Sequence, residues 1–128
     1  MALKIVLKPY ERMIIGGAVV KNGSGKTEFF IENKPTLLRE KDILSEKDAD
    51  TLARKIYFTI QLMYIDPENL VNHHNTYWKL VQMIIEAAPS SLAIIDQISE
   101  ALLGSRYYLA LKVTRKLIEY EQEIIDRV

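Results

Sequence analysis

The residues in this 128-residue sequence that could carry catalytic or metal chemistry are few, and their spacing argues against both roles. The two histidines, His73 and His74, are adjacent, so on a helix they point about 100° apart and cannot bind one metal ion from one face. Neither has a carboxylate or cysteine at the spacing of a zinc site. Ser90 and Ser91 lack the G-x-S-x-G context of a nucleophile and are expected to cap a helix. We therefore expect no enzymatic activity, no metal and no cofactor.

Basic side chains are the remaining candidates, because they concentrate in the first third of the chain. Residues 1–41 contain eight lysines and arginines and four acids, a balance of +4, so the rest of this neutral chain carries −4. Basic groups near a strand edge can bind RNA phosphates, and arginine can also read the edge of guanine. The candidate RNA contacts are Lys4, Lys8, Arg39 and Lys41. On composition alone, a solvated strand surface explains them equally well.

The elements that must position these bases are strands. The first third of the chain alternates with a period of two, which predicts five short antiparallel strands with lysines pointing outward from the first. Gly16-Gly17 predicts a bend or bulge, and residues 22–25 predict a hairpin, so that residues 27–32 pair back onto residues 18–21. So small a sheet needs the helices or a second copy to cover its apolar face.

After residue 44 the apolar period becomes helical and predicts four helices. The first two are expected at about 46–65, starting at a Ser45 cap, and at about 68–88. The third is expected between Ser91 and Gly104, and the last follows a Ser105 cap. The second half of the first helix is apolar almost all round, so this helix faces either the sheet or another copy. The candidate oligomer or partner interface is Ile56, Ile60, Met63, Tyr64, Val113, Leu117 and Tyr120.

The fold class predicted from these patterns is α+β. A small antiparallel β unit at residues 1–44 is followed by a helical unit at residues 45–128, and we expect the two to pack as one compact domain. No cysteine is present, no apolar run reaches the roughly 18 residues of a membrane span, and the N-terminus lacks the pattern of a signal peptide. These features favour a cytoplasmic protein without a membrane partner.

Several segments together resemble the FlbT family, the flagellum biosynthesis repressor proteins of alphaproteobacteria. The resemblance covers nearly the whole chain, in residues 3–12 (LKIVLKPYER), 17–23 (GAVVKNG), 32–44 (ENKPTLLREKDIL), 53–58, 61–64, 107–112 and 115–121. One departure is Tyr10, where the resemblance leads us to expect a glycine after the proline. This departure bears on the conformation of the first turn.

The resemblance implies a cytoplasmic post-transcriptional regulator. Proteins of this family are associated with the 5′ untranslated region of flagellin mRNA and lower its translation or stability, in some species acting positively, alongside the flagellin-associated protein FlaF. A fainter likeness links residues 3–44 to CsrA, the carbon storage regulator, which is a dimer that binds mRNA leaders. Matched on that pattern, Lys8 and Arg39 fall where CsrA places bases that contact RNA.

Two functions from different classes remain open. In the first, a dimeric RNA-binding regulator uses the β unit to hold a flagellin mRNA leader, and its helices form the homodimer or dock a partner. In the second, a protein-binding module of flagellar assembly acts on flagellin or a flagellin chaperone without touching RNA. The neutral net charge and the strong apolar stripes of the helices favour the second.

Overall fold

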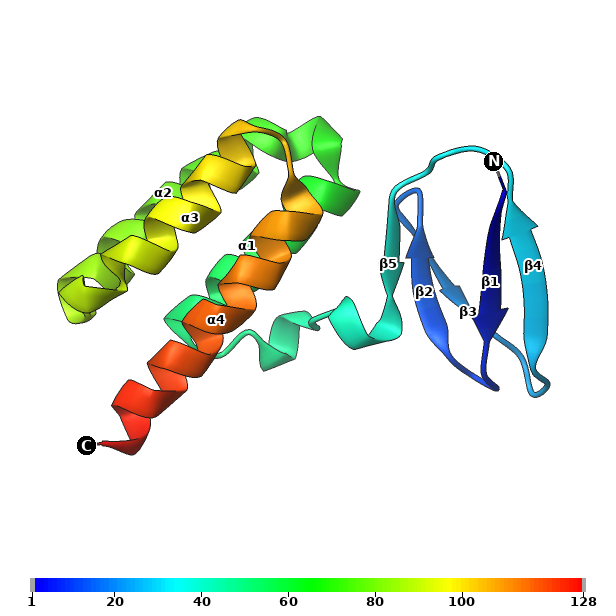
Figure 1. The fold of residues 1–128 in the computed structure, drawn as a ribbon, viewed down its shortest axis with the longest axis horizontal. Helices are drawn as coiled ribbons and strands as arrows, with labels where there is room; N and C mark the ends of the chain where they lie inside the picture. Colours follow the sequence, from blue (N-terminus) through cyan, green and yellow to red (C-terminus); the bar gives the residue numbers. More distant parts are fainter. Residues whose placement is uncertain (1, 128) are drawn as a thin grey trace. The chain divides into compact units, whose positions relative to one another are not determined.

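A computed structural model of the protein describes residues 2–127. Within this range five short antiparallel strands precede four helices, which confirms the predicted α+β class (Figure 1). The chain divides into two compact units after Ile43, one residue before the position expected from the sequence. We call residues 1–43 the strand unit and residues 44–128 the helical unit.

The strand unit contains two small antiparallel sheets. In the first, β1 (Leu3–Leu7) pairs with β4 (Thr27–Ile31), so that Lys4 lies opposite Phe30 and Leu7 opposite Thr27. In the second, β2 (Arg12–Ile15) is the middle strand, between β3 (Ala18–Lys21) and β5 (Leu37–Arg39). The chain therefore passes between the sheets three times, after β1, β3 and β4.

Both sheets contribute apolar side chains to the core of the strand unit. Side chains alternate along a strand, so every second residue of β1 and β4 points inward. The inward residues form one buried cluster of Ile5, Leu7, Met13 and Ile31, with Ile15, Phe29 and Leu37 packed against it. The other face of β1 and β4 remains largely at the surface and presents charged side chains together with Phe30.

The structure corrects two turn predictions. Gly16 and Gly17 form the two-residue turn of the β2–β3 hairpin, with φ of 57° and 89°, and not a bend or bulge within a strand. Positive φ at both positions matches the twist of paired strands, and glycine adopts it without a steric penalty. Residues 22–25 do not join paired strands, because β4 pairs with β1 and not with β3. They carry the chain from the second sheet back to the first.

Asn22 holds this connection in place. Its side-chain nitrogen donates to the carbonyl oxygens of Lys8 and Gly25 at 2.8 and 2.9 Å. Its side-chain oxygen accepts from the Thr27 hydroxyl at 2.7 Å and from the Gly23 N–H at 2.9 Å. The same amide therefore binds the end of β1 and the start of β4, which fixes where these two strands meet.

The turn after β1 places a tyrosine where glycine is the favoured residue. The Glu11 N–H donates to the Lys8 carbonyl oxygen at 3.1 Å, which closes a four-residue turn with Pro9 second and Tyr10 third. Tyr10 has a φ of 61°, a left-handed conformation in which an L side chain is strained. Proline second and positive φ third are the features of a type II turn. The turn thus keeps the conformation that glycine would adopt, although the residue is tyrosine.

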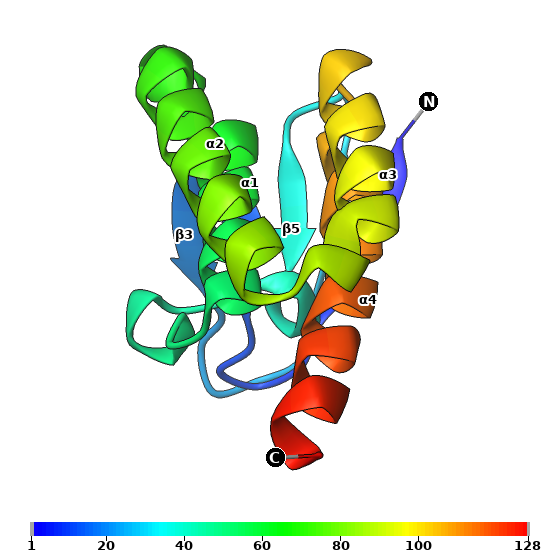
Figure 2. The same cartoon turned by 90° about the vertical axis from the view of Figure 1, so that its left-hand side faces the viewer.

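The helical unit consists of two helical hairpins. The first is formed by α1 (Leu52–Ile65) and α2 (Leu70–Ala87), and the second by α3 (Leu92–Leu103) and α4 (Tyr107–Asp126) (Figure 2). α1 also packs against α4, which joins the hairpins. Tyr77 of α2 connects them on the other side, because its hydroxyl lies 2.9 Å from the Ser99 hydroxyl of α3.

α1 begins six residues later than predicted. Residues 46–48 form a separate 3₁₀ turn, and the Ser45 hydroxyl donates to the carboxylate of Asp48 at 2.7 Å and does not accept from a backbone N–H. Thr51 is the N-cap of α1, and its hydroxyl oxygen accepts from the Arg54 N–H at 3.2 Å.

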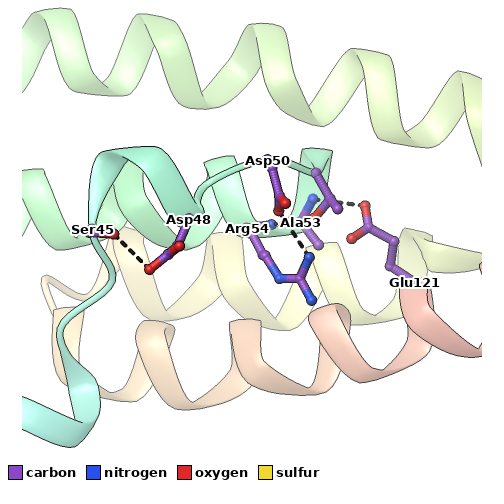
Figure 3. A network of polar contacts seen from close by, with 7 residues as sticks. Ser45, Asp48, Asp50, Ala53, Arg54 and Glu121 are labelled. Carbon is purple, nitrogen blue, oxygen red and sulfur yellow. Dashed lines mark hydrogen bonds and ion pairs between the residues drawn. The ribbon is translucent and has the colours of Figure 1, made fainter.

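The start of α1 is also capped from another helix. The Ala53 N–H donates to the carboxylate of Glu121 in α4 at 3.0 Å (Figure 3). A carboxylate at a helix N-terminus is favoured both by the unpaired N–H groups and by the helix dipole. Glu121 therefore ties the two central helices together at a point where the sequence pattern shows only an exposed acid.

The predicted serine caps of the later helices make other contacts. The Ser91 hydroxyl donates to the Ala88 carbonyl oxygen at 2.7 Å, and Ser90 hydrogen-bonds the Tyr120 hydroxyl. Neither caps α3 with its side chain.

Ser105 ends α3 and does not cap α4. The Arg106 N–H donates to the Ala101 carbonyl oxygen at 2.8 Å and the Ser105 N–H to that of Leu102 at 3.0 Å, which is a Schellman motif. Its left-handed residue is Ser105, with a φ of 55°, and not the preceding Gly104.

The residues predicted as an oligomer or partner interface lie mostly in the core of the helical unit. Five of them, Ile56, Ile60, Met63, Val113 and Leu117, are buried within the single chain. Tyr64 and Tyr120 are half-buried. The apolar stripes of α1 and α4 are therefore used largely where these helices pack on their neighbours, and Tyr64 and Tyr120 are the predicted interface residues that stay partly accessible.

Candidate functional site

Four basic side chains from separate segments of the strand unit line one surface groove of about 690 Å³. The segments are the end of β1, the start of β4, and the end of β5 with the turn that follows it. The structure thus brings together three of the four predicted RNA contacts and adds one that the sequence did not indicate. The lining residues are Val6, Lys8, Glu11, Lys26, Arg39 and Lys41.

Backbone contacts position two of these charged side chains. The Arg39 guanidinium donates to the Val6 carbonyl oxygen at 3.4 Å, which directs this β5 side chain along β1. The Glu11 carboxylate accepts from the Lys8 N–H at 2.9 Å across the Tyr10 turn. The acid in the groove wall is therefore held by the turn that it stabilises.

The groove carries an excess of positive charge, because its lining holds four bases and one acid. Lys8, Lys26, Arg39 and Lys41 are all exposed, so these charges act at the protein surface. A concave surface lined by one sign of charge concentrates ligands of the opposite sign. The arrangement therefore suits a polyanion, and the guanidinium of Arg39 adds a planar donor that can pair with phosphate or with a base edge.

Lys4, the fourth predicted RNA contact, does not line the groove. Its ammonium group pairs with the Glu28 carboxylate of β4 at 3.1 Å, and both side chains are about half exposed, at 53%. Exposed ion pairs of this kind contribute about 0–1 kcal/mol. Lys4 thus remains on the outer face of the β1–β4 sheet with a partner that it can exchange at little cost.

Lys26 is the groove residue that sequence reasoning missed. Its place beside Lys8 follows from the pairing of β4 with β1, in which Thr27 lies opposite Leu7. The hairpin predicted at residues 22–25 pairs β4 with β3 and would place Lys26 away from Lys8. In the structure the Asn22 side chain bonds both the end of β1 and the segment before β4, but no local sequence pattern indicates this link.

His73 has a structural contact at the junction of two helices. The His73 ring nitrogen Nε2 lies 3.0 Å from a carboxylate oxygen of Asp66, at the junction of α1 and α2. Hydrogen bonds from Asn69 and then from His73 lower the pKa of Asp66 below its ordinary value of 3.8. Among residues 2–127, no group of three or more histidine, aspartate or glutamate side chains is placed to hold a metal ion.

A second, apolar hollow of about 200 Å³ lies in the helical unit, between the end of α2 and the last turns of α4. Its walls include Ile84, Leu117, Tyr120, Ile124 and Ile125. Ile125 is 48% exposed, so an apolar side chain from another protein can reach it.

No helix in the described part of the chain combines the length and apolar character required to cross a bilayer.

Comparison with known proteins places the whole chain in one family. The model of the family described as "Flagellar protein FlbT" matches residues 3–125. A protein of Bradyrhizobium diazoefficiens named "Probable flagellum biosynthesis repressor protein FlbT 1" is 45% identical over 97% of this chain and 85% of its own length.

Two further relatives agree. The "Flagellum biosynthesis repressor protein FlbT" of Caulobacter vibrioides is 35% identical over 100% of this chain and 92% of its own length. A Rhodopseudomonas palustris relative named "Probable flagellum biosynthesis repressor protein FlbT" is 36% identical over 99% of this chain and 100% of its own length. No solved structure gives a significant match. The chain belongs to the FlbT family of flagellar proteins.

Proposed function

We propose that this protein is a cytoplasmic post-transcriptional regulator of flagellin synthesis, which binds the 5′ untranslated region of flagellin mRNA and lowers its translation or stability. The names of the relatives, flagellum biosynthesis repressors, support a regulatory role and describe no enzyme. The observation that carries the RNA-binding part is the groove in the strand unit, where four bases from distant segments converge around one acid.

Chain folding, and not local sequence, creates this convergence. Lys8 and Lys26 are 18 residues apart, and Arg39 follows 13 residues later. Bases that only keep a surface soluble have no reason to gather from separate strands into one concavity, because like charges at close range repel one another. Binding of a polyanion offsets that repulsion, and phosphate contacts supply most of the sequence-independent affinity of nucleic-acid-binding proteins.

The proposal is tested by charge reversal inside and outside the groove. The first variant carries Lys8→Glu with Arg39→Glu, and the control carries Lys21→Glu with Lys34→Glu. The control removes two exposed bases of the same unit that do not line the groove, and it makes the same change in net charge. Binding to a labelled flagellin 5′ leader is measured by fluorescence anisotropy at fixed salt. Only the groove variant is expected to lose affinity.

The salt dependence provides a second readout. If two phosphate contacts are lost, the slope of log K against log salt should become shallower by about 1.4, since each contact on a single strand contributes about 0.7. Equal loss of affinity in both variants would show that only the general surface charge of the protein binds RNA. No loss in either variant would show that the groove does not bind RNA.

The second candidate function is a protein-binding module of flagellar assembly that acts on flagellin or a flagellin chaperone, with FlaF as a further possible partner. The observation that favours it is the apolar hollow between α2 and α4 in the helical unit. Replacing the exposed Ile125 by glutamate places a charge in this hollow, and it should abolish binding to the purified protein partner but leave leader binding unchanged. A protein complex that survives nuclease and 1 M salt, and is lost in Ile125→Glu, would establish this function in place of the first.

We retain the homodimer as part of the proposal. Two copies would present two basic grooves to one leader, and linked contacts raise affinity by effective concentration without new contacts. The mass of the protein in solution, measured by light scattering at micromolar concentration, tests this directly. A protein that remains monomeric at every concentration would contradict the homodimer, and each RNA leader would then meet one groove per protein molecule.

A further inference from the structure

Phe30 is the exposed aromatic side chain of the outer face of the β1–β4 sheet. Its neighbour Phe29 is half-buried and packs against the core of the strand unit. Because side chains alternate along a strand, Phe30 points to the other side, and it is 61% exposed. A single exposed apolar side chain is ordinary on a protein surface, so what makes Phe30 a candidate is its position relative to the groove.

The face that carries Phe30 is the face that forms one wall of the groove. On β1 and just beyond it, Val6 and Lys8 line the groove, and they point to the same side as Lys4, two residues before Val6. Lys4 lies directly opposite Phe30 in the pairing of β1 with β4. On the β4 side, Lys26 lines the groove and alternates in phase with Phe30. The ring therefore lies along the same sheet face, beyond the end of the groove.

The chemistry of this face combines a basic groove with an aromatic ring and a weakly paired ammonium. Both side chains of the Lys4–Glu28 ion pair are about half exposed, and such pairs contribute little, so Lys4 can exchange Glu28 for a phosphate. A phenylalanine ring cannot read a hydrogen-bond pattern, but it stacks on any base whose face is open. Bases within a duplex are already stacked on their neighbours, so only an unpaired base can use this ring.

We propose that the ligand of the groove is single-stranded RNA and that Phe30 is a base-stacking subsite at one end of it, with Lys4 holding the adjacent phosphate. This inference rests on the proposed function, since it takes the groove as an RNA site. It assigns a role to an apolar side chain that charge-based reasoning passes over. It also gives Lys4 a function although Lys4 lies outside the groove.

The experiment compares Phe30→Leu, which keeps an apolar side chain but removes the ring, with Phe30→Tyr, which keeps the ring. The probe is the flagellin 5′ leader, used alone and annealed along its full length to its complement, and the readout is anisotropy across a salt series. Phe30→Leu should weaken binding to the free leader about 5- to 150-fold, the range found for loss of one stacked base. Phe30→Tyr should bind the free leader as the wild type does. Neither change should alter the salt slope or the weaker binding to the annealed leader.

The possible results separate this inference from the proposed function. If Phe30→Leu binds the free leader like the wild type, while Lys8→Glu with Arg39→Glu weakens it, the stacking subsite is wrong and the groove stands. If the folded wild type binds neither RNA, both fail. If Phe30→Leu leaves RNA affinity unchanged but alters the mass in solution, the ring belongs to a contact between copies and the inference is overturned.

A measurement on the wild type covers the case in which Phe30→Leu does not fold. Irradiation of the complex at 254 nm should cross-link a base to Phe30 within the tryptic peptide of residues 27–39, which keeps its internal Lys34-Pro35 bond. Because this peptide also contains the groove residue Arg39, the cross-linked residue is located by fragment-ion sequencing. Competition with unlabelled leader should remove the cross-link. Cross-links confined to residues other than Phe30 would contradict the stacking subsite.

Discussion

Replacing Tyr10 by glycine and, separately, by alanine tests the strained turn that leads from Lys8 into the second sheet. Tyr10 has a φ of 61°, and its ring lies 5.8 Å from the Lys21 ammonium group. Both replacements remove the ring and this contact, so the comparison of glycine with alanine isolates the backbone. Left-handed φ costs a residue with a β-carbon about 1–2 kcal/mol. Glycine avoids this strain but loses about 0.5–1 kcal/mol through the greater freedom of the unfolded chain.

The expected difference is therefore about 0.5–1 kcal/mol in favour of Tyr10→Gly, a ratio of about two- to fivefold in local opening. Hydrogen exchange of the amides in β1 and β4, followed by mass spectrometry, reports the opening of the strand unit itself. Fluorescence of Trp78, the single tryptophan, reports the helical unit and should not change. Equal protection in the two variants, or greater protection in Tyr10→Ala, would show that this turn does not hold the left-handed conformation.

Three further predictions concern the helical unit. Ser105→Gly should stabilise it by about 0.5–1 kcal/mol relative to Ser105→Ala in urea unfolding, because residue 105 is the left-handed residue of the α3–α4 turn. Gln61→Ala should destabilise it by about 2–4 kcal/mol, since the buried Gln61 amide accepts from the Leu44 N–H at 2.8 Å and donates to its carbonyl oxygen at 2.9 Å. Burial raises the pKa of the Tyr77 phenol above 10.0. The neutral phenol therefore contributes fully to the free energy of unfolding below pH 10, and this contribution is lost as the pH rises through the raised pKa. Tyr77→Phe should make alkaline unfolding less steep, and an unchanged pH profile would contradict this assignment.

The sequence was sufficient for the elements of this fold but not for their partners. Alternation located the strands, and the 3.6-residue period located the helices to within a few residues at most ends. The predicted pairing of β4 with β3 is wrong, because the Asn22-Gly23 signal is local while pairing with β1 depends on contacts between residues 20 to 28 positions apart. Asn22 is used as a link between the sheets, and this role has no local signature.

The starts of the helices also show that residue type alone does not identify a cap. Ser45 and Ser105 have the residue type of a cap, but a cap also requires a backbone that turns into the helix at that point. Ser45 bonds the Asp48 side chain, and Ser105 takes the left-handed position of the preceding C-terminus. Glu121 caps α1 across the helical unit, from 68 residues away, and no spacing rule predicts a contact of that kind.

The candidate site was predicted in part for a physical reason. Lys8 and Arg39 stand at strand ends, where alternation already implies exposure, and the structure places both in the groove. Lys4 shares the face of Lys8 but lies too far along β1 to line the groove, and Lys26 required the correct strand pairing. The apolar stripes of α1, with Ile60, and of α4, with Leu117, cannot be divided by sequence into core and interface residues, because both roles demand the same residue types at the same period.

The measurement that tests the central claim most directly is binding of the wild-type protein to a labelled flagellin 5′ leader between 50 and 200 mM salt. A scrambled RNA of the same length and composition is the control. We expect the leader to bind more tightly than the scrambled RNA at each salt concentration. We also expect a slope of up to about −3, or an approximately 50-fold loss of affinity over this range, for four phosphate contacts in the groove. A folded protein that binds neither RNA, or binds both equally, would contradict a leader-binding groove and move the function to a protein partner of the helical unit.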